Sequence, residues 1–116
     1  MGPPIRILLL EDDPAAPVLW RTFFAGQGDM ELCGWVRDGW NGLEAVDRQR
    51  PDAVLMDLIL PGMDGLEFLA ALNRRQDRPA AVVASPLGNR VVIQRAAALG
   101  ADYYFVKPVR PQSVAD

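Results

Sequence analysis

The chain has 116 residues, 50% hydrophobic and 23% charged, with a formal net charge of −3, which suits one domain with a core and argues against a nucleic-acid-binding surface of its own. Histidine is absent, so histidine-based acid–base catalysis and histidine metal ligation are excluded. No apolar run reaches the roughly 18 residues of a membrane helix, and the lone Cys33 forms no internal disulfide, which fits a cytoplasmic location.

The first half of the chain alternates between strand and helix patterns. Residues 5–10 are an apolar, branched run and predict a buried strand. Asp13 is expected to cap the following helix, with Pro14 at its first position, where a missing N–H has no consequence. A second strand is predicted over residues 31–36 and a second helix within residues 39–50.

The alternation continues through the second half. It predicts strand 52–56, a helix after a Pro-Gly-rich turn, strand 80–84, helix 89–100 and strand 102–106. A fifth helix is expected near residue 111 or 112, but the sequence stops at 116, so this helix is truncated or missing. The βαβα order predicts a doubly wound α/β fold, with a parallel sheet and helices on both faces.

Three predicted strands end on charged side chains. Strand 5–10 runs into Glu11 and Asp12, strand 52–56 into Asp57, and strand 102–106 into Lys107. If the first and third strands are neighbours, the three carboxylates meet at one rim of the sheet, where open parallel sheets bind ligands. Two carboxylates about 4 Å apart repel by about 4 kcal/mol at an effective dielectric near 20. A hard divalent cation such as Mg²⁺ would relieve that repulsion.

Asp57 is placed to act as a nucleophile. A carboxylate can attack a phosphoryl donor and form an acyl phosphate. Lys107 would stabilise the charge on the transferring group. It is the single lysine among twelve basic residues, the rest being arginine, which suggests that a compact ammonium is needed there.

The sequence resembles a receiver domain of bacterial two-component response regulators. The segments LLLEDDP, VLMDLILPGMDGLEFL, VVAS and LGADYYFVKP match that family's pattern in order and spacing over essentially the whole chain. The resemblance implies a single receiver domain over residues 1–116 with a flavodoxin-like strand order of 2-1-3-4-5. It also implies an output domain that is absent from this chain.

The resemblance assigns a phosphorylation and metal site. Asp57 is its phosphoacceptor. Asp12 and Asp57 would bind Mg²⁺ directly, or Mn²⁺ in its place, with Glu11 acting through water and the backbone carbonyl of Ile59 as a further ligand. The chain would be a signalling domain that catalyses only its own phosphotransfer and dephosphorylation.

The resemblance also assigns a switch. Ser85 holds the hydroxyl that bonds the phosphoryl group, Lys107 pairs with the phosphate, and Tyr104 is the aromatic switch residue. Taken alone, Tyr104 reads as a core residue, as does Tyr103. Phosphorylation would draw Ser85 inward and allow the Tyr104 ring to move from an exposed to a buried position.

The partners follow from the family. The resemblance implies a histidine kinase or histidine phosphotransferase as donor, and self-association as a dimer, including one formed by segment exchange. DNA would be bound only through the missing output domain, and no membrane contact is expected. Residues 85–108 most resemble the stage-zero sporulation regulators. Three features depart from the family pattern. Pro86 after Ser85 bears on the mobility of that loop, and Val109 stands where Phe is usual after Lys-Pro. The truncated or missing final helix bears on dimerisation through the usual face.

Two alternatives remain. A degenerate receiver would bind a partner without phosphorylation, with Pro86 and the short tail freezing the switch. An aspartate-nucleophile phosphohydrolase of the haloacid-dehalogenase type would need a second aspartate two residues after Asp57, where this chain has Ile59. Nucleotide binding is disfavoured, because no Gly-rich phosphate loop follows the first strand.

Overall fold

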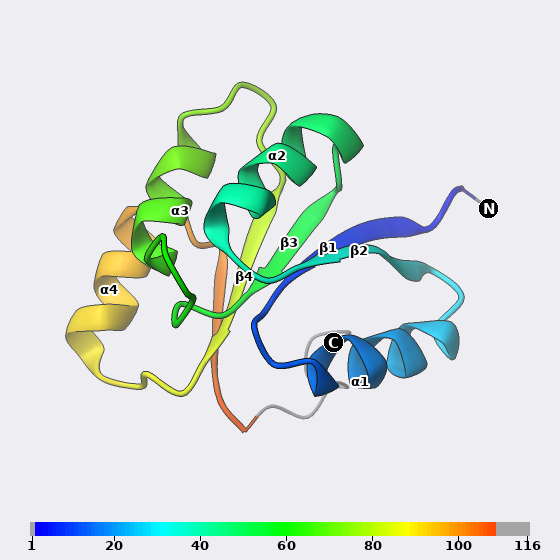
Figure 1. The fold of residues 1–116 in the computed structure, drawn as a ribbon, viewed down its shortest axis with the longest axis horizontal. Helices are drawn as coiled ribbons and strands as arrows, with labels where there is room; N and C mark the ends of the chain where they lie inside the picture. The colour runs from blue at the N-terminus through cyan, green and yellow to red at the C-terminus, as the bar shows by residue number, and fades with distance from the viewer. Residues whose placement is uncertain (1, 109–116) are drawn as a thin grey trace.

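The computed structural model describes residues 2–108 and has one parallel sheet with helices on both faces (Figure 1). The elements are β1 (Ile5–Leu10), α1 (Ala15–Ala25), β2 (Met30–Val36), α2 (Gly39–Gln49), β3 (Ala53–Met56), α3 (Gly65–Asn73), β4 (Ala80–Ser85), α4 (Arg90–Ala98) and β5 (Tyr103–Val106). The strand order β2-β1-β3-β4-β5 confirms the predicted doubly wound, flavodoxin-like fold. Val109 and the predicted fifth helix lie outside the described residues.

Two hydrophobic clusters hold the layers together. Successive side chains of a strand point to opposite faces, so the central strands must be apolar throughout. On one face, α1 packs Trp20 and Phe24 against Leu9 of β1 and Leu55 of β3. On the other face, α2, α3 and α4 cover the remaining apolar side chains of the strands (Figure 1), among which Phe68 of α3 is fully buried.

The helix starts follow capping chemistry, with one correction. The side chains of Asp38, Asp64 and Asn89 accept hydrogen bonds from backbone N–H groups in the first turns of α2, α3 and α4. The prediction that Asp13 is the N-cap of the first helix is wrong by one residue, because Pro14 holds that position. The Asp13 carboxylate still accepts a hydrogen bond from the N–H of Ala15 at 2.9 Å.

An irregular register shapes the carboxyl edge of the sheet. Strand β1 lies between β2 and β3, so the ends of β1 and β3 are adjacent as predicted. The pairing of β1 with β2 slips by one residue between Ile7 and Leu8. Beyond the slip, the N–H of Glu11 donates to the carbonyl of Val36 at 3.0 Å. The residues that follow β2 are thereby fixed beside the residues that follow β1.

Strand β5 forms one edge of the sheet and is less covered than the sequence suggests. Tyr103, expected in the core, is 66% exposed. Its partner in β4 is Val82, whose side chain belongs to the α1-side cluster, so Tyr103 faces the side that α1 covers only in part.

No helix within residues 2–108 is long and apolar enough to cross a membrane.

Candidate phosphoacceptor site

The Lys107 ammonium joins two buried carboxylates at the carboxyl edge of the sheet. Its Nζ donates to Asp57 Oδ2 at 2.8 Å and to Glu11 Oε1 at 2.9 Å. Asp57 and Glu11 are only 7% and 8% exposed. Three strand ends that are far apart in the sequence therefore supply one compact charged cluster, as the pattern of strand ends predicted.

Burial and charge act against each other in this cluster. Burial raises the pKa of Glu11 above its usual value, and this outweighs the hydrogen bond and charge of Lys107. The neighbouring charge of Asp57 acts in the same direction as burial. For Lys107, burial alone would lower the pKa, but hydrogen bonds to Asp57 and Glu11 raise it above its ordinary value. The lysine is therefore held as a cation between the two acids.

The backbone fixes the position of Asp57. Its N–H donates to the carbonyl of Leu10 at 3.1 Å, which continues the β1–β3 ladder one step past the strands. One carboxylate oxygen, Oδ1, accepts from the N–H of Ile59 at 2.9 Å, while Oδ2 faces Lys107. Ile59 thus lies in the loop beside the carboxylate, where its carbonyl was predicted to be a metal ligand.

Asp12 departs from the predicted arrangement. Its carboxylate does not join Glu11 and Asp57 but forms an ion pair with Arg37, with Nη2 3.3 Å from Oδ1. Within the part of the chain that the structure describes, no three carboxylate or thiolate side chains are grouped closely enough to hold a metal ion. In this structure Asp12 therefore lies with Arg37, and a shared metal site of Glu11, Asp12 and Asp57 stays a prediction. Consecutive residues project in different directions, and Arg37 attracts the exposed one.

Ser85 and Tyr104 lie next to the cluster and are connected through the β4–α4 loop. Ser85 is fully buried, and its Oγ accepts from the N–H of Leu87 at 3.3 Å. The Tyr104 hydroxyl donates to the carbonyl of Leu87, and its ring packs against the α2–α4 side of the core. Burial raises the pKa of Tyr104 above its usual value. In this structure the ring is already half-buried, so the movement from exposed to buried stays a prediction.

The cluster borders a cavity between α1 and the sheet. A cavity of about 260 Å³ reaches Glu11, Asp57 and Lys107 at one end and continues between α1 and the sheet. Apolar side chains such as Leu9 and Trp20 line the remainder. The cluster thus forms the polar end of a mostly apolar cavity.

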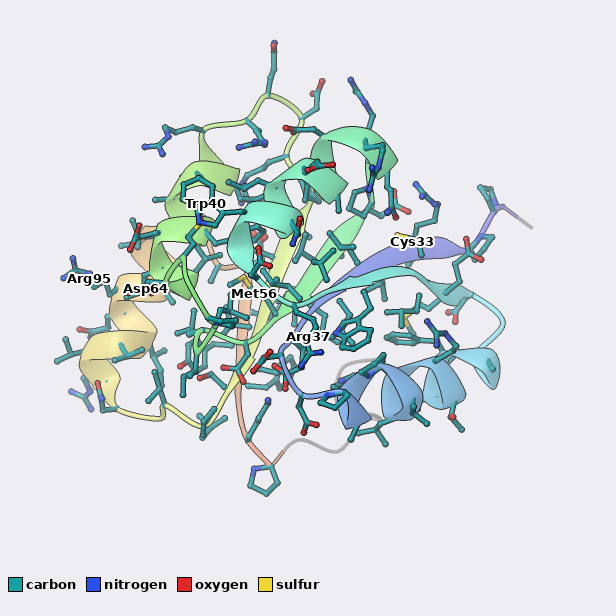
Figure 2. The ribbon with its side chains drawn as sticks, in the orientation of Figure 1. Cys33, Arg37, Trp40, Met56, Asp64 and Arg95 are labelled. Atoms are coloured by element: carbon teal, nitrogen blue, oxygen red, sulfur yellow. The ribbon has the colours of Figure 1, made fainter. Side chains whose placement is uncertain are left out.

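Sequence reasoning missed two residues of this region, Arg37 and Trp35. Figure 2 shows Arg37 at the carboxyl edge of the sheet, whereas Arg95 lies out on α4. Trp35 donates its indole N–H to the carbonyl of Glu11 at 2.7 Å, and the Arg37 guanidinium lies 5.6 Å from the centre of the Trp35 ring. The only sequence signal was that Arg37 directly follows a predicted strand.

The fold and the cluster define an α/β domain with an acidic, lysine-containing rim. The family model of the response regulator receiver domain matches residues 7–116. The chain therefore belongs to the family of response regulator receiver domains, which act in phosphorylation-based signalling.

Curated relatives agree with this assignment. The chain is 40% identical, over 91% of its length and 34% of the relative's, to the transcriptional activator protein PfeR of Pseudomonas aeruginosa. It is 38% identical, over 73% of its length and 24% of the relative's, to protein-glutamate methylesterase/protein-glutamine glutaminase 5 of Myxococcus xanthus. The chain thus spans about a quarter to a third of these relatives. Neither relative is named as a sporulation regulator, so that assignment stays a prediction.

A solved structure supports the fold. The receiver domain of the putative response regulator NarL from Mycobacterium tuberculosis superposes with a TM-score of 0.89 at 24% identity, covering 97% of this chain and 91% of that one.

Proposed function

We propose that this receiver domain is a phosphorylation-controlled switch in which Asp57 accepts a phosphoryl group from the phosphohistidine of a histidine kinase or histidine phosphotransferase. The observation that carries the proposal is the buried Asp57 carboxylate with Lys107 Nζ 2.8 Å from one of its oxygens. An oxygen of Asp57 forms the new bond to phosphorus while the bond from phosphorus to the donor's imidazole nitrogen breaks.

The neighbouring groups suit charge stabilisation. Lys107 is a fixed cation beside the attacking carboxylate, and the N–H of Ile59 holds the other carboxylate oxygen. Such preorganised donors favour the charge that spreads over a transferring phosphoryl group. The hydroxyl of Ser85, adjacent to this rim, is proposed to bond the phosphoryl oxygen, and Tyr104 to follow it through the contacts both make with Leu87.

Receiver domains generally bind Mg²⁺ at their acidic pocket, and the donors here fit that ion. Glu11, Asp12 and Asp57 offer only hard oxygen ligands, and Mg²⁺ needs just one or two carboxylates because it keeps several waters. We propose that Asp12, Asp57 and the Ile59 carbonyl hold Mg²⁺, with Glu11 acting through water and Mn²⁺ as a substitute. Bound there, the ion would neutralise charge on the phosphoryl oxygens.

The wider context rests on the family and on the relatives' names. Because PfeR is named a transcriptional activator, we propose that an output domain outside these 116 residues binds DNA, and that this domain, with its net charge of −3, does not. We also propose that this receiver domain acts in the cytoplasm. A role in sporulation is the narrower form of the same proposal.

The proposal is tested by incubating the protein with acetyl phosphate, with and without Mg²⁺, and locating the phosphoryl group by mass spectrometry. We expect labelling of the wild type only with Mg²⁺, and none in Asp57→Asn. Asp77→Asn is the matched control, since Asp77 is exposed and its positive φ of 56° is one that Asn tolerates. Equal labelling of wild type and Asp57→Asn would refute the assignment of Asp57.

Beryllofluoride with Mg²⁺ separates the alternatives. A switch binds this phosphoryl mimic at Asp57 and changes its association. A phosphohydrolase turns over phosphate esters, although the position two residues after Asp57 holds Ile59 instead of a second aspartate. A degenerate receiver, in which Pro86 freezes the loop, neither binds the mimic nor turns over substrate.

A further inference from the structure

Arg37 holds Asp12 by more than a single ion pair. Its Nη2 donates to the Asp12 backbone carbonyl at 3.0 Å, and its Nε lies 3.4 Å from the carboxylate oxygen Oδ1, which Nη2 also approaches to 3.3 Å. The guanidinium also lies over the Trp35 ring. The planar guanidinium of arginine can donate several hydrogen bonds and stack on an aromatic ring at the same time, whereas the ammonium of lysine cannot.

The carboxylates at this rim are thus divided between two cations. Lys107 forms ion pairs with the buried Glu11 and Asp57, and Arg37 forms an ion pair with the exposed Asp12. The two cations differ in how easily they are displaced. Lys107 is partly buried between two acids, while the Arg37 and Asp12 side chains are each more than half exposed. Exposed pairs are weak, so the Arg37 contact is the one that a dication can break.

We propose that Arg37 is an internal competitor for the divalent cation: it neutralises the Asp12 carboxylate in the metal-free domain and must release it when Mg²⁺ binds. The inference rests on the Mg²⁺ site of the proposed function. Arg37 is therefore a positioning residue, and its effect is to raise the Mg²⁺ concentration at which the site fills.

The surrounding contacts make this exchange local and reversible. The backbone carbonyl of Asp12 and the Trp35 ring can keep the guanidinium in place after the carboxylate has left it. Trp35 is itself fixed by its indole bond to the Glu11 carbonyl, and β2 is tied to Glu11 through Val36. The movement required is a change of partner by one side chain, with no change in the strands.

The variant that tests the inference is Arg37→Met, which removes the charge and the donors but keeps an unbranched side chain over Trp35. Arg90→Met is the matched control, because Arg90 is exposed at the start of α4 and forms none of the ion pairs found among residues 2–108. Mg²⁺ alone is titrated into each protein by calorimetry at low ionic strength, where exposed charge pairs are least screened. Urea unfolding of both variants checks that they fold.

We expect Arg37→Met to bind Mg²⁺ about two- to fivefold more tightly than the wild type, the range that corresponds to an exposed ion pair. Arg90→Met should bind within error of the wild type. In wild-type NMR spectra, the Arg37 Nε–H resonance should shift with the same midpoint as the calorimetric curve.

Three results would overturn the inference: equal or weaker binding by Arg37→Met, an equal gain in Arg90→Met, or an Arg37 resonance that does not respond to Mg²⁺. A wild type that takes up no Mg²⁺ would overturn both proposals. Mg²⁺ uptake without any phosphoryl labelling of Asp57 would refute the proposed function and leave the role of Arg37 standing.

Discussion

Lys107 is the residue on which the charge balance of the site depends. Its ammonium lies within 2.9 Å of two carboxylates, and its side chain is one-third exposed. An ammonium is compact and can point its three donors at separate oxygens, whereas a guanidinium is planar and larger. Substitution by arginine would keep the charge but displace it from the position between Glu11 and Asp57.

We therefore predict that Lys107→Arg lowers the rate of phosphoryl uptake by Asp57 by about tenfold. This loss is smaller than the roughly 100-fold or greater loss that follows removal of a stabilising donor, because the charge is kept but displaced. Labelling by acetyl phosphate, followed by mass spectrometry over time, measures the rate. The control is Arg48→Lys, since Arg48 is exposed on α2 and, among residues 2–108, pairs only with Glu44 on the same helix. If Lys107→Arg responds as well as the wild type, the solitary lysine is an accident of composition.

At the residue scale, the sequence predicted the cluster of Glu11, Asp57 and Lys107 but not the partner of Asp12. Asp57 and Lys107 could be placed because each ends an apolar run, and parallel strands end at one edge. The contact of Asp12 with Arg37 could not be predicted, because it depends on the register slip between β1 and β2. A slip of one residue decides which side chain of β2 lies opposite a given position of β1.

At the scale of elements, the turn from β3 into α3 depends on close backbone contact. A Cβ on Gly65 would lie 2.4 Å from Leu58 Cα and 2.6 Å from its carbonyl oxygen. The same carbonyl accepts the N–H of Gly65 at 3.0 Å, so the two backbones cannot separate without losing a hydrogen bond. The sequence marked this stretch as a turn, but only the structure identifies steric contact as the reason for glycine.

We predict that Gly65→Ala destabilises the domain by about 1–3 kcal/mol, the range for forced overpacking. Gly26→Ala is the matched control: its φ is −85°, and the nearest atom to an added Cβ is 3.5 Å away. Urea unfolding followed by circular dichroism measures both. If the two variants have similar free energies of unfolding, the backbone at Leu58 can move away from the added Cβ without a measurable cost, and the prediction is wrong.

At the scale of the whole molecule, the alternating pattern was sufficient to predict a parallel sheet with helices on both faces, because each central strand is apolar on both faces. The strand order came from the resemblance to receiver domains, and the structure confirms it. The prediction was weakest at the edge. Tyr103 looked like a core residue, yet it is 66% exposed, and Val106 is 46% exposed. Burial at an edge strand depends on which element covers it, and the fifth helix expected to do so falls outside the described residues.

The exposed edge strand leads to a prediction about assembly. β5 pairs only with β4, so one side of it is unpaired within residues 2–108, and apolar side chains flank it. Such edges favour pairing or segment exchange between chains. We predict that the 116-residue chain forms a dimer, including when Asp57 is not phosphorylated. Sedimentation over a range of concentrations, with and without beryllofluoride and Mg²⁺, measures the association.

Val106→Asp should weaken the dimer, whereas Val18→Asp, at a 65% exposed position of α1, should not. A monomer under both conditions at high concentration would contradict the prediction, and equal loss of dimer in both variants would place the interface elsewhere.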